Sequence, residues 1–121
     1  MTIDFSRDKP IYTQLVERIC GEIIRGALKP GDRLLSVREY AVDVGVNVNT
    51  VQRVYKELEL MNLTETKRGQ GTFITESKER LVNLREEMKQ NLVDSFLYNM
   101  ESFGFTREEM VEVLLAKGRG E

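Results

Sequence analysis

The sequence of 121 residues predicts a mainly α-helical chain with one small β-hairpin, an α+β fold class, organised in two parts. Apolar residues recur at helical spacing in three segments of the first half. Two β-prone segments around a glycine-containing turn come next and end at Glu76. From Ser77 a long helical pattern runs without glycine or proline. We therefore expect a compact domain over residues 1–76 and a two-helix tail over residues 77–121.

The first helix is predicted in the stretch KPIYTQLVERICGEIIRG. Its apolar residues recur at strict i+4 spacing, which is typical of an amphipathic helix. These residues are Ile11, Leu15, Ile19 and Ile23. Pro10 suits the first turn of this helix and Gly26 suits its end. LKPGDRLL then predicts a turn at Pro30 and Gly31, followed by a short extended segment.

A second and a third helix are predicted from their capping residues. Ser36 and Glu39 have the spacing of a capping box, in which each side chain accepts a hydrogen bond from the other residue's backbone N–H. Gly45 limits this helix to about Asp43. Asn47 then caps a third helix, NVNTVQRVYKELELM. Its buried face is expected to contain Val51, Val54 or Tyr55, Leu58 and Met61.

A β-hairpin is predicted after the third helix. Asn62 stands where the end of a helix favours a residue that tolerates positive φ. LTETK and TFITE follow as β-prone segments, with RGQG between them as the turn. The stretch TKRGQGTFI could also belong to a phosphate-binding loop. Such a loop joins a strand to a helix, and this one joins two strands, so the hairpin is favoured.

The tail is predicted to contain one long and one short helix. SKERLVNLREEMKQNLVDSFLYNMESF carries an apolar stripe about 30 Å long. The stripe consists of Leu81, Leu84, Met88, Leu92, Phe96 and Met100. Gly104 ends this helix, and Thr106 with Glu109 forms a second capping box. The last helix has Met110, Val113 and Leu114 on one side. A stripe of this length on an isolated helix needs a covering surface, either a partner chain or the first domain.

Composition excludes several classes of protein. No run of about 18 apolar residues is present to span a membrane, and the N-terminus does not resemble a signal peptide. Cys20 is the only cysteine and is expected to be a buried thiol, so neither a disulfide framework nor a cysteine metal site is predicted. The chain has no histidine, the commonest general base and metal ligand. These features favour a cytoplasmic protein without cofactors and argue against an enzyme.

Three helices and a hairpin, with a short glycine turn between the second and third helices, form the plan of a winged helix-turn-helix domain. In that plan the N-terminal end of the third helix can enter the major groove of DNA. Polar residues lie there: Asn47, Asn49, Thr50, Gln52 and Arg53. Amide side chains can bond to adenine edges, and Thr50 suits a phosphate. Arg38, in the first turn of the second helix, could reach the DNA backbone or a base. Because the net charge is −2, such a surface requires local clustering of cations.

The turn of the hairpin would be the tip of the wing. Lys67, Arg68, Gly69 and Gln70 lie there, and the glycine lets the backbone approach the duplex closely. The two cations would contact phosphates or the narrow minor groove. Taken alone, a glycine turn with two cations is also typical of an ordinary solvated hairpin. The polar third helix, Arg38 and the cationic turn together favour the wing.

Residues 10–75 are similar to the DNA-binding domain of GntR-type transcription regulators. The matching pieces are IRGALKPGDRL, SVRE, NTVQRVYKELE and RGQGTFI, in the order and spacing of that family. The resemblance implies DNA contacts by the following residues: Arg38, Asn49, Thr50, Gln52, Arg53, Arg68, Gly69 and Gln70. Three positions depart from the family pattern. Leu35 stands in place of a usual proline, Asn62 in place of glycine, and Val48 where many members have arginine.

The short tail resembles the YtrA-type branch of that family, in which the tail is a dimerisation element. Other branches carry a much larger effector-binding domain or an aminotransferase-like domain. We therefore expect Leu92, Phe96 and Met100 to lie in a two-fold interface. A groove between tail and winged domain could hold a small-molecule effector, although no group of residues identifies one.

The sequence thus predicts a homodimeric, sequence-specific DNA-binding regulator, a repressor acting on a roughly palindromic operator. Two alternatives remain: a winged domain that binds another protein, and an enzyme. Salt-dependent binding to duplex DNA separates the first alternative from the prediction.

Overall fold

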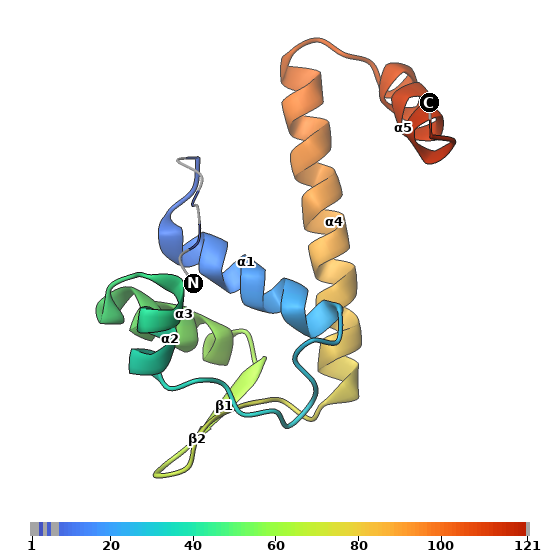
Figure 1. The fold of residues 1–121 in the computed structure, drawn as a ribbon. Coiled ribbons are helices and arrows are strands. Elements are labelled where there is room, and N and C mark those ends of the chain that lie inside the picture. The colour runs from blue at the N-terminus through green and yellow to red at the C-terminus, as the bar shows by residue number, and fades with distance from the viewer. Residues whose placement is uncertain (1–2, 4, 6–7, 121) are drawn as a thin grey trace. The chain divides into compact units, whose positions relative to one another are not determined.

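The computed structural model describes residues 3, 5 and 8–120, and its fold is mainly α-helical with a two-stranded hairpin (Figure 1). The elements in chain order are α1 (Ile11–Ile24), α2 (Val37–Val44), α3 (Val48–Leu60), β1 (Thr64–Lys67), β2 (Gly71–Ile74), α4 (Lys78–Ser102) and α5 (Arg107–Gly118). The chain forms two compact units, which we call the winged unit (Met1–Leu84) and the tail unit (Arg85–Glu121). Within the described residues, every helix is too short or too polar to cross a membrane.

The core of the winged unit lies between its first three helices, because α1 and α2 both pack on α3. The predicted stripe of α1 is confirmed at Leu15, Ile19 and Ile23, which are buried. Ile11 is 44% exposed, because it begins the helix and lies at the edge of the core. Pro10 precedes the helix as its N-cap rather than lying in its first turn. Cys20 is buried, as predicted.

The two caps that orient α2 and α3 are confirmed. The Ser36 backbone N–H donates to Glu39 Oε1 at 2.9 Å, and the Glu39 N–H donates to Ser36 Oγ at 3.1 Å. Gly45 ends α2 with a φ of 74°, a left-handed conformation that glycine adopts without a steric cost. The Asn47 side chain accepts from the Asn49 N–H at 2.7 Å and so begins α3. The chain therefore reverses between α2 and α3 within Gly45–Asn47.

The buried face of α3 agrees with the prediction at four positions. Val51, Val54, Tyr55 and Leu58 are buried, whereas Met61 is half-buried because it follows the last helical residue as the C-cap. Asn62 has a φ of 60°, as its place after the helix predicted.

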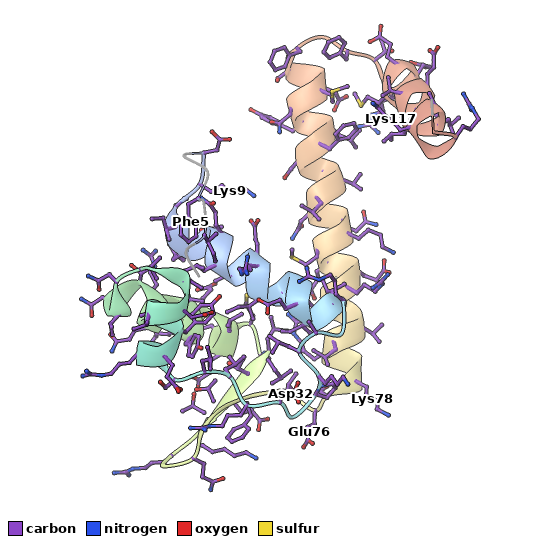
Figure 2. All side chains as sticks on the ribbon, in the orientation of Figure 1. Phe5, Lys9, Asp32, Glu76, Lys78 and Lys117 are labelled. Carbon is purple, nitrogen blue, oxygen red and sulfur yellow. The ribbon has the colours of Figure 1, made fainter. Side chains whose placement is uncertain are left out.

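The hairpin is confirmed, and a third extended segment pairs with it. β1 and β2 are antiparallel, with Glu65 opposite Phe73 and Lys67 opposite Gly71. Residues 31–34 lie along the other edge of β2, where the Leu34 N–H donates to the Thr72 carbonyl and the Ile74 N–H donates to the Asp32 carbonyl, both at 2.8 Å. The labelled Asp32 and Glu76 lie near each other where this segment meets the end of β2 (Figure 2).

The first turns of α4 belong to the winged unit. Leu84 is buried, and Arg80 Nε donates to the Met61 carbonyl at 2.8 Å. These contacts attach the beginning of the long helix to the end of α3.

The tail unit consists of the rest of α4 and α5. The Thr106–Glu109 capping box that begins α5 is confirmed, and Gly104 follows α4 with a φ of 88°. Met110 is buried. Val113 and Leu114, predicted on the same side of α5, are 52% and 57% exposed in the single chain. The tail unit therefore leaves much of its apolar surface uncovered.

Candidate nucleic-acid interface

The residues predicted to contact DNA are accessible in the winged unit. Nine of the ten are exposed, and Thr50 is half-buried. They come from α2 (Arg38), the start of α3 (Asn47, Asn49, Thr50, Gln52, Arg53) and the hairpin turn (Lys67, Arg68, Gly69, Gln70). Figure 1 shows the hairpin turn projecting away from the three helices. The surface thus has two separate parts, a helix start and a loop tip.

The start of α3 is held by burial of its opposite face. Val51, Val54 and Leu58 have no solvent exposure, so the rotation of α3 about its axis is fixed by close packing. Asn49 and Gln52 therefore remain on the exposed side. Their amides each offer a donor and an acceptor, the pair that an adenine edge in the major groove requires.

Other groups at the start of α3 are partly committed within the chain. The Asn47 side-chain oxygen accepts the Asn49 N–H, which leaves its amide NH₂ for other partners. Val48 is 37% exposed and places an apolar side chain on this surface. In the first turn of α3 the backbone N–H groups of Asn49, Thr50 and Val51 all donate to Asn47, so these donors are used within the chain.

Arg53 has a contact that the sequence did not reveal. Its guanidinium carbon lies 3.6 Å from the centroid of the Tyr12 ring, which α1 supplies. A planar guanidinium over an aromatic face is attracted by the ring and held in a restricted orientation. No spacing rule within one helix can reveal such a pair, because its members lie on different helices far apart in the sequence.

Arg38 lies in the first turn of α2, next to a capping box and to a hydrogen bond from α3. The capping box fixes the first turn of α2, and hydrogen bonding by Ser36 holds the pKa of Glu39 below its ordinary value. The Tyr55 hydroxyl donates to the Leu35 carbonyl at 2.7 Å, directly before α2. Burial raises the pKa of Tyr40, whose ring lies 5.9 Å from that of Tyr55, to about 12.

Burial also raises the pKa of Tyr55, so its hydroxyl keeps its proton and remains a donor at any physiological pH. The hydrogen bond from Tyr55 to the backbone before α2 is therefore neutral and does not change with physiological pH.

The hairpin turn presents cations on a constrained backbone. Gly69 has a φ of 76°, and a Cβ added there would meet no atom within 4 Å. Glycine is therefore favoured at this position because of the positive φ, and not because a larger side chain would clash. Lys67 Nζ lies 5.0 Å from the centroid of the Phe73 ring, which orients this side chain along β2. Arg68 and Gln70 are exposed at the tip.

A third cation, Arg33, lies beside the hairpin and was missed from the sequence. It is exposed and forms an isolated bridge with Phe73 on β2. Its Nε is only 2.7 Å from the position that a Cβ on Gly71 would occupy. The sequence predicted an extended segment here but gave no signal that it would pair with β2.

The tail unit contains an apolar groove of about 350 Å³ between α4 and α5. Leu92 and Phe96, two of the predicted interface residues, line it, and they are 58% and 38% exposed. Met100, the third, is half-buried and is not part of its lining. Nowhere in the described part of the chain do three histidine, cysteine or carboxylate side chains come close enough to hold a metal ion.

Comparison with known proteins places these features among transcription regulators. The family model described as "Bacterial regulatory proteins, gntR family" matches residues 11–74. The uncharacterised HTH-type transcriptional regulator YhcF of Bacillus subtilis is 43% identical over 93% of this chain and 93% of its own length. The HTH-type transcriptional repressor YtrA of the same organism is 37% identical over 82% of this chain and 81% of its own.

A solved structure of a GntR family transcriptional regulator from Listeria monocytogenes is also similar. It is 38% identical, with a TM-score of 0.83, and the match covers 93% of this chain and 98% of that one. The likeness to these short proteins extends beyond the winged unit into the tail.

Proposed function

The chain belongs to the GntR family of bacterial regulatory proteins, in its short-tailed YtrA-like branch, and from this premise we propose that it is a homodimeric transcriptional repressor. As a member of this family it is a DNA-binding transcription regulator. We propose further that it acts in the cytoplasm by binding alone, without catalysis. Two winged units would bind the two halves of a roughly palindromic operator.

In this proposal α3 reads the sequence and the hairpin adds affinity. One observation carries it: the start of α3 presents exposed Asn49 and Gln52 while the opposite face of the same helix is fully buried. Exposed amides on a helix whose rotation is fixed by packing suit the recognition of base edges. Thr50, Arg53 and Arg38 would hold the backbone on either side.

The wing would supply attraction that depends little on base identity. Lys67 and Arg68 are exposed at a turn whose glycine leaves open space around it. Phosphates are alike along a duplex, so these cations would strengthen binding to every sequence.

Dimerisation is assigned to the tail unit. Its groove of about 350 Å³ is lined mostly by apolar side chains that the single chain leaves exposed. A second copy would cover this surface, and Leu92, Phe96 and Met100 would lie near the two-fold axis. A small molecule that changes this arrangement would act as an effector.

The experiment is a salt titration on a duplex selected from a random DNA pool for binding. The variant with Lys67→Ala and Arg68→Ala should bind the selected and an unrelated duplex more weakly by a similar factor. Its slope of log affinity against log salt should be smaller by about 0.9 for each lost phosphate contact. Lys89→Ala with Lys117→Ala is the matched control, since it removes the same charge from the tail. Gly69→Val tests the conformation, and should impair binding because of the positive φ while leaving the dimer folded.

An unchanged slope in the wing variant, with wild-type binding intact, would mean that the hairpin does not touch DNA. Absence of salt-dependent binding by the wild type would contradict the whole proposal and would favour a protein-binding role instead.

A further inference from the structure

The edge segment at residues 31–34 places Arg33 on one particular face of the hairpin. Arg33 and Phe73 form an antiparallel bridge, with backbone hydrogen bonds on either side of the pair. Residues directly opposite each other in an antiparallel pair project to the same face. Arg33 and Phe73 therefore share a face, and Phe73 shares it with Glu65, its partner on β1.

Lys67 and Gly71 lie on that same face, because side chains alternate along a strand. The contact between Lys67 Nζ and the Phe73 ring confirms this direction. Two cations from segments far apart in the sequence, Arg33 and Lys67, thus flank Gly71 from opposite edges of β2.

The Arg33 side chain runs across Gly71 toward the hairpin turn. A Cβ on Gly71 would meet its Nε at 2.7 Å, one of its terminal nitrogens at 3.4 Å and Cζ at 3.5 Å. Three atoms of the guanidinium group therefore pass over this one backbone position, which only glycine leaves free. Gly71 is the first residue of β2, next to the turn, so the cation is brought toward the tip that carries Arg68.

This face of the sheet carries two cations and one carboxylate. Arg33 and Lys67 gather beside Phe73, and Glu65 is the acidic residue in the same rows of the sheet. Among the described residues, Arg33 forms no salt bridge within 4 Å, and its side chain is exposed. Hydrogen bonds from Ser36 lower the pKa of Glu39, and the charge of Arg33 contributes to the same shift. A guanidinium presents a fork of N–H donors that matches a phosphate.

We propose that Arg33 binds a backbone phosphate of the DNA, and that Gly71 is glycine because this side chain must cross it. The inference rests on the proposed function, and it adds to the wing a cation from outside the hairpin. Lys67 and Arg68 act from the turn, whereas Arg33 acts from the edge segment.

The test measures binding to a 30-base-pair duplex of arbitrary sequence by fluorescence anisotropy over a series of salt concentrations. Arg33→Gln should reduce the slope of log affinity against log salt by about 0.9, and should bind roughly eight-fold more weakly at 0.1 M salt, as one lost phosphate contact implies. Arg33→Lys keeps the charge and should retain most of the slope. Arg25→Gln is the matched control, because it removes the same charge from the exposed end of α1 and should leave the slope unchanged.

Gly71→Ala tests the path of the side chain. It should weaken binding in the wild-type background because the added Cβ displaces the guanidinium. The backbone at Gly71 has a φ of 125°, so the variant also introduces strain. Combining it with Arg33→Gln separates the two effects, since the strain persists when the arginine is gone. We expect Gly71→Ala to cause a smaller loss in the Arg33→Gln background than in the wild type.

The outcomes are distinguishable from failure of the proposed function. If wild-type binding is salt-dependent and Arg33→Gln has the wild-type slope, the contact by Arg33 is wrong while DNA binding stands. If Gly71→Ala costs the same in both backgrounds, the glycine serves the backbone alone and the second half of the proposal is wrong. If the wild type shows no salt-dependent binding, both proposals fail. Thermal unfolding of each variant checks that it is folded. The Arg33 variants are expected to unfold at the temperature of the wild type, because this side chain is exposed.

Discussion

The winged unit and the tail unit differ in how far each one covers its own apolar side chains. In the winged unit Val51 and Leu58 have no solvent exposure. In the tail unit Leu92 is 58% exposed, Phe96 38% and Leu114 57%, and only Met110 is buried among its described residues. The first unit closes its core within one chain, whereas the second leaves its groove open.

The two units therefore differ in where their stability comes from: burial within one chain for the winged unit, and burial against another surface for the tail unit. Burial of apolar area contributes roughly 25 cal/mol per Å², and the winged unit obtains this contribution on folding. The tail unit would obtain most of it only when another surface covers the groove between α4 and α5. The apolar side chains of this groove are therefore not covered in the isolated chain, and we propose that a second copy covers them.

The largest effect is expected from placing a charge in the tail groove. Phe96→Asp would bury an unpaired carboxylate in the proposed interface, which costs several kcal/mol and should yield monomers. Binding to the selected operator should fall strongly, because one winged unit contacts only one half-site. Analytical ultracentrifugation measures the dimer, and anisotropy measures DNA binding.

Tyr98→Asp is the matched control for this variant. Tyr98 is 75% exposed and lies on the same helix outside the residues that line the groove. It should leave the dimer nearly intact. A dimer that survives Phe96→Asp unchanged would mean that the tail groove is not the interface, and the contrast between the two units would lose its explanation.

The next effect concerns the core that the winged unit closes by itself. Leu58→Ala removes a fully buried side chain from α3 and should destabilise the winged unit by about 2–5 kcal/mol. Because this core is complete in one chain, the loss should not depend on protein concentration. Thermal unfolding at several concentrations measures it, and a loss that disappears at high concentration would place Leu58 in the dimer contact instead.

Much of the fold could be predicted from the sequence, because local rules decide where helices begin and which faces they bury. Ser36 with Glu39 and Thr106 with Glu109 form the predicted capping boxes. Asn62 has the predicted positive φ. Such features depend on neighbours a few residues away, so the spacing of residues is sufficient to find them.

Contacts between distant segments could not be predicted in the same way. The pairing of Arg33 with Phe73 and the stacking of Arg53 on Tyr12 depend on how the elements pack in three dimensions. Ile11 belongs to the predicted apolar stripe of α1 but is exposed, because it begins the helix at the edge of the core. A helical pattern in the sequence does not show where the core ends. Nine of the ten predicted DNA-contact residues are exposed and Thr50 is half-buried, and their contacts with DNA stay a prediction.

A smaller effect, confined to the winged unit, is expected at the start of α3. Asn49→Ala and Gln52→Ala should each reduce discrimination between selected and unrelated DNA by about 1–3 kcal/mol, if each amide bonds to a base edge by two hydrogen bonds. The dimer should be unaffected, since these side chains lie far from the tail in the sequence and are exposed on α3. Anisotropy on both duplexes measures the difference. Equal losses on the two would show that these residues contact the backbone.

The smallest effect tests whether α1 contributes to DNA binding through Arg53. Tyr12→Leu keeps an apolar side chain but removes the ring that lies 3.6 Å from the guanidinium carbon. An exposed cation–π contact contributes about 0.5–1 kcal/mol, so binding should weaken by roughly two- to five-fold as Arg53 loses its fixed orientation. Tyr12→Phe keeps the ring and should bind like the wild type. In an Arg53→Ala background Tyr12→Leu should have no further effect, because the group that it positions is absent. If Tyr12→Leu weakens binding equally in both backgrounds, Tyr12 acts by supporting the packing of α1, and its contact with Arg53 does not contribute to the affinity for DNA.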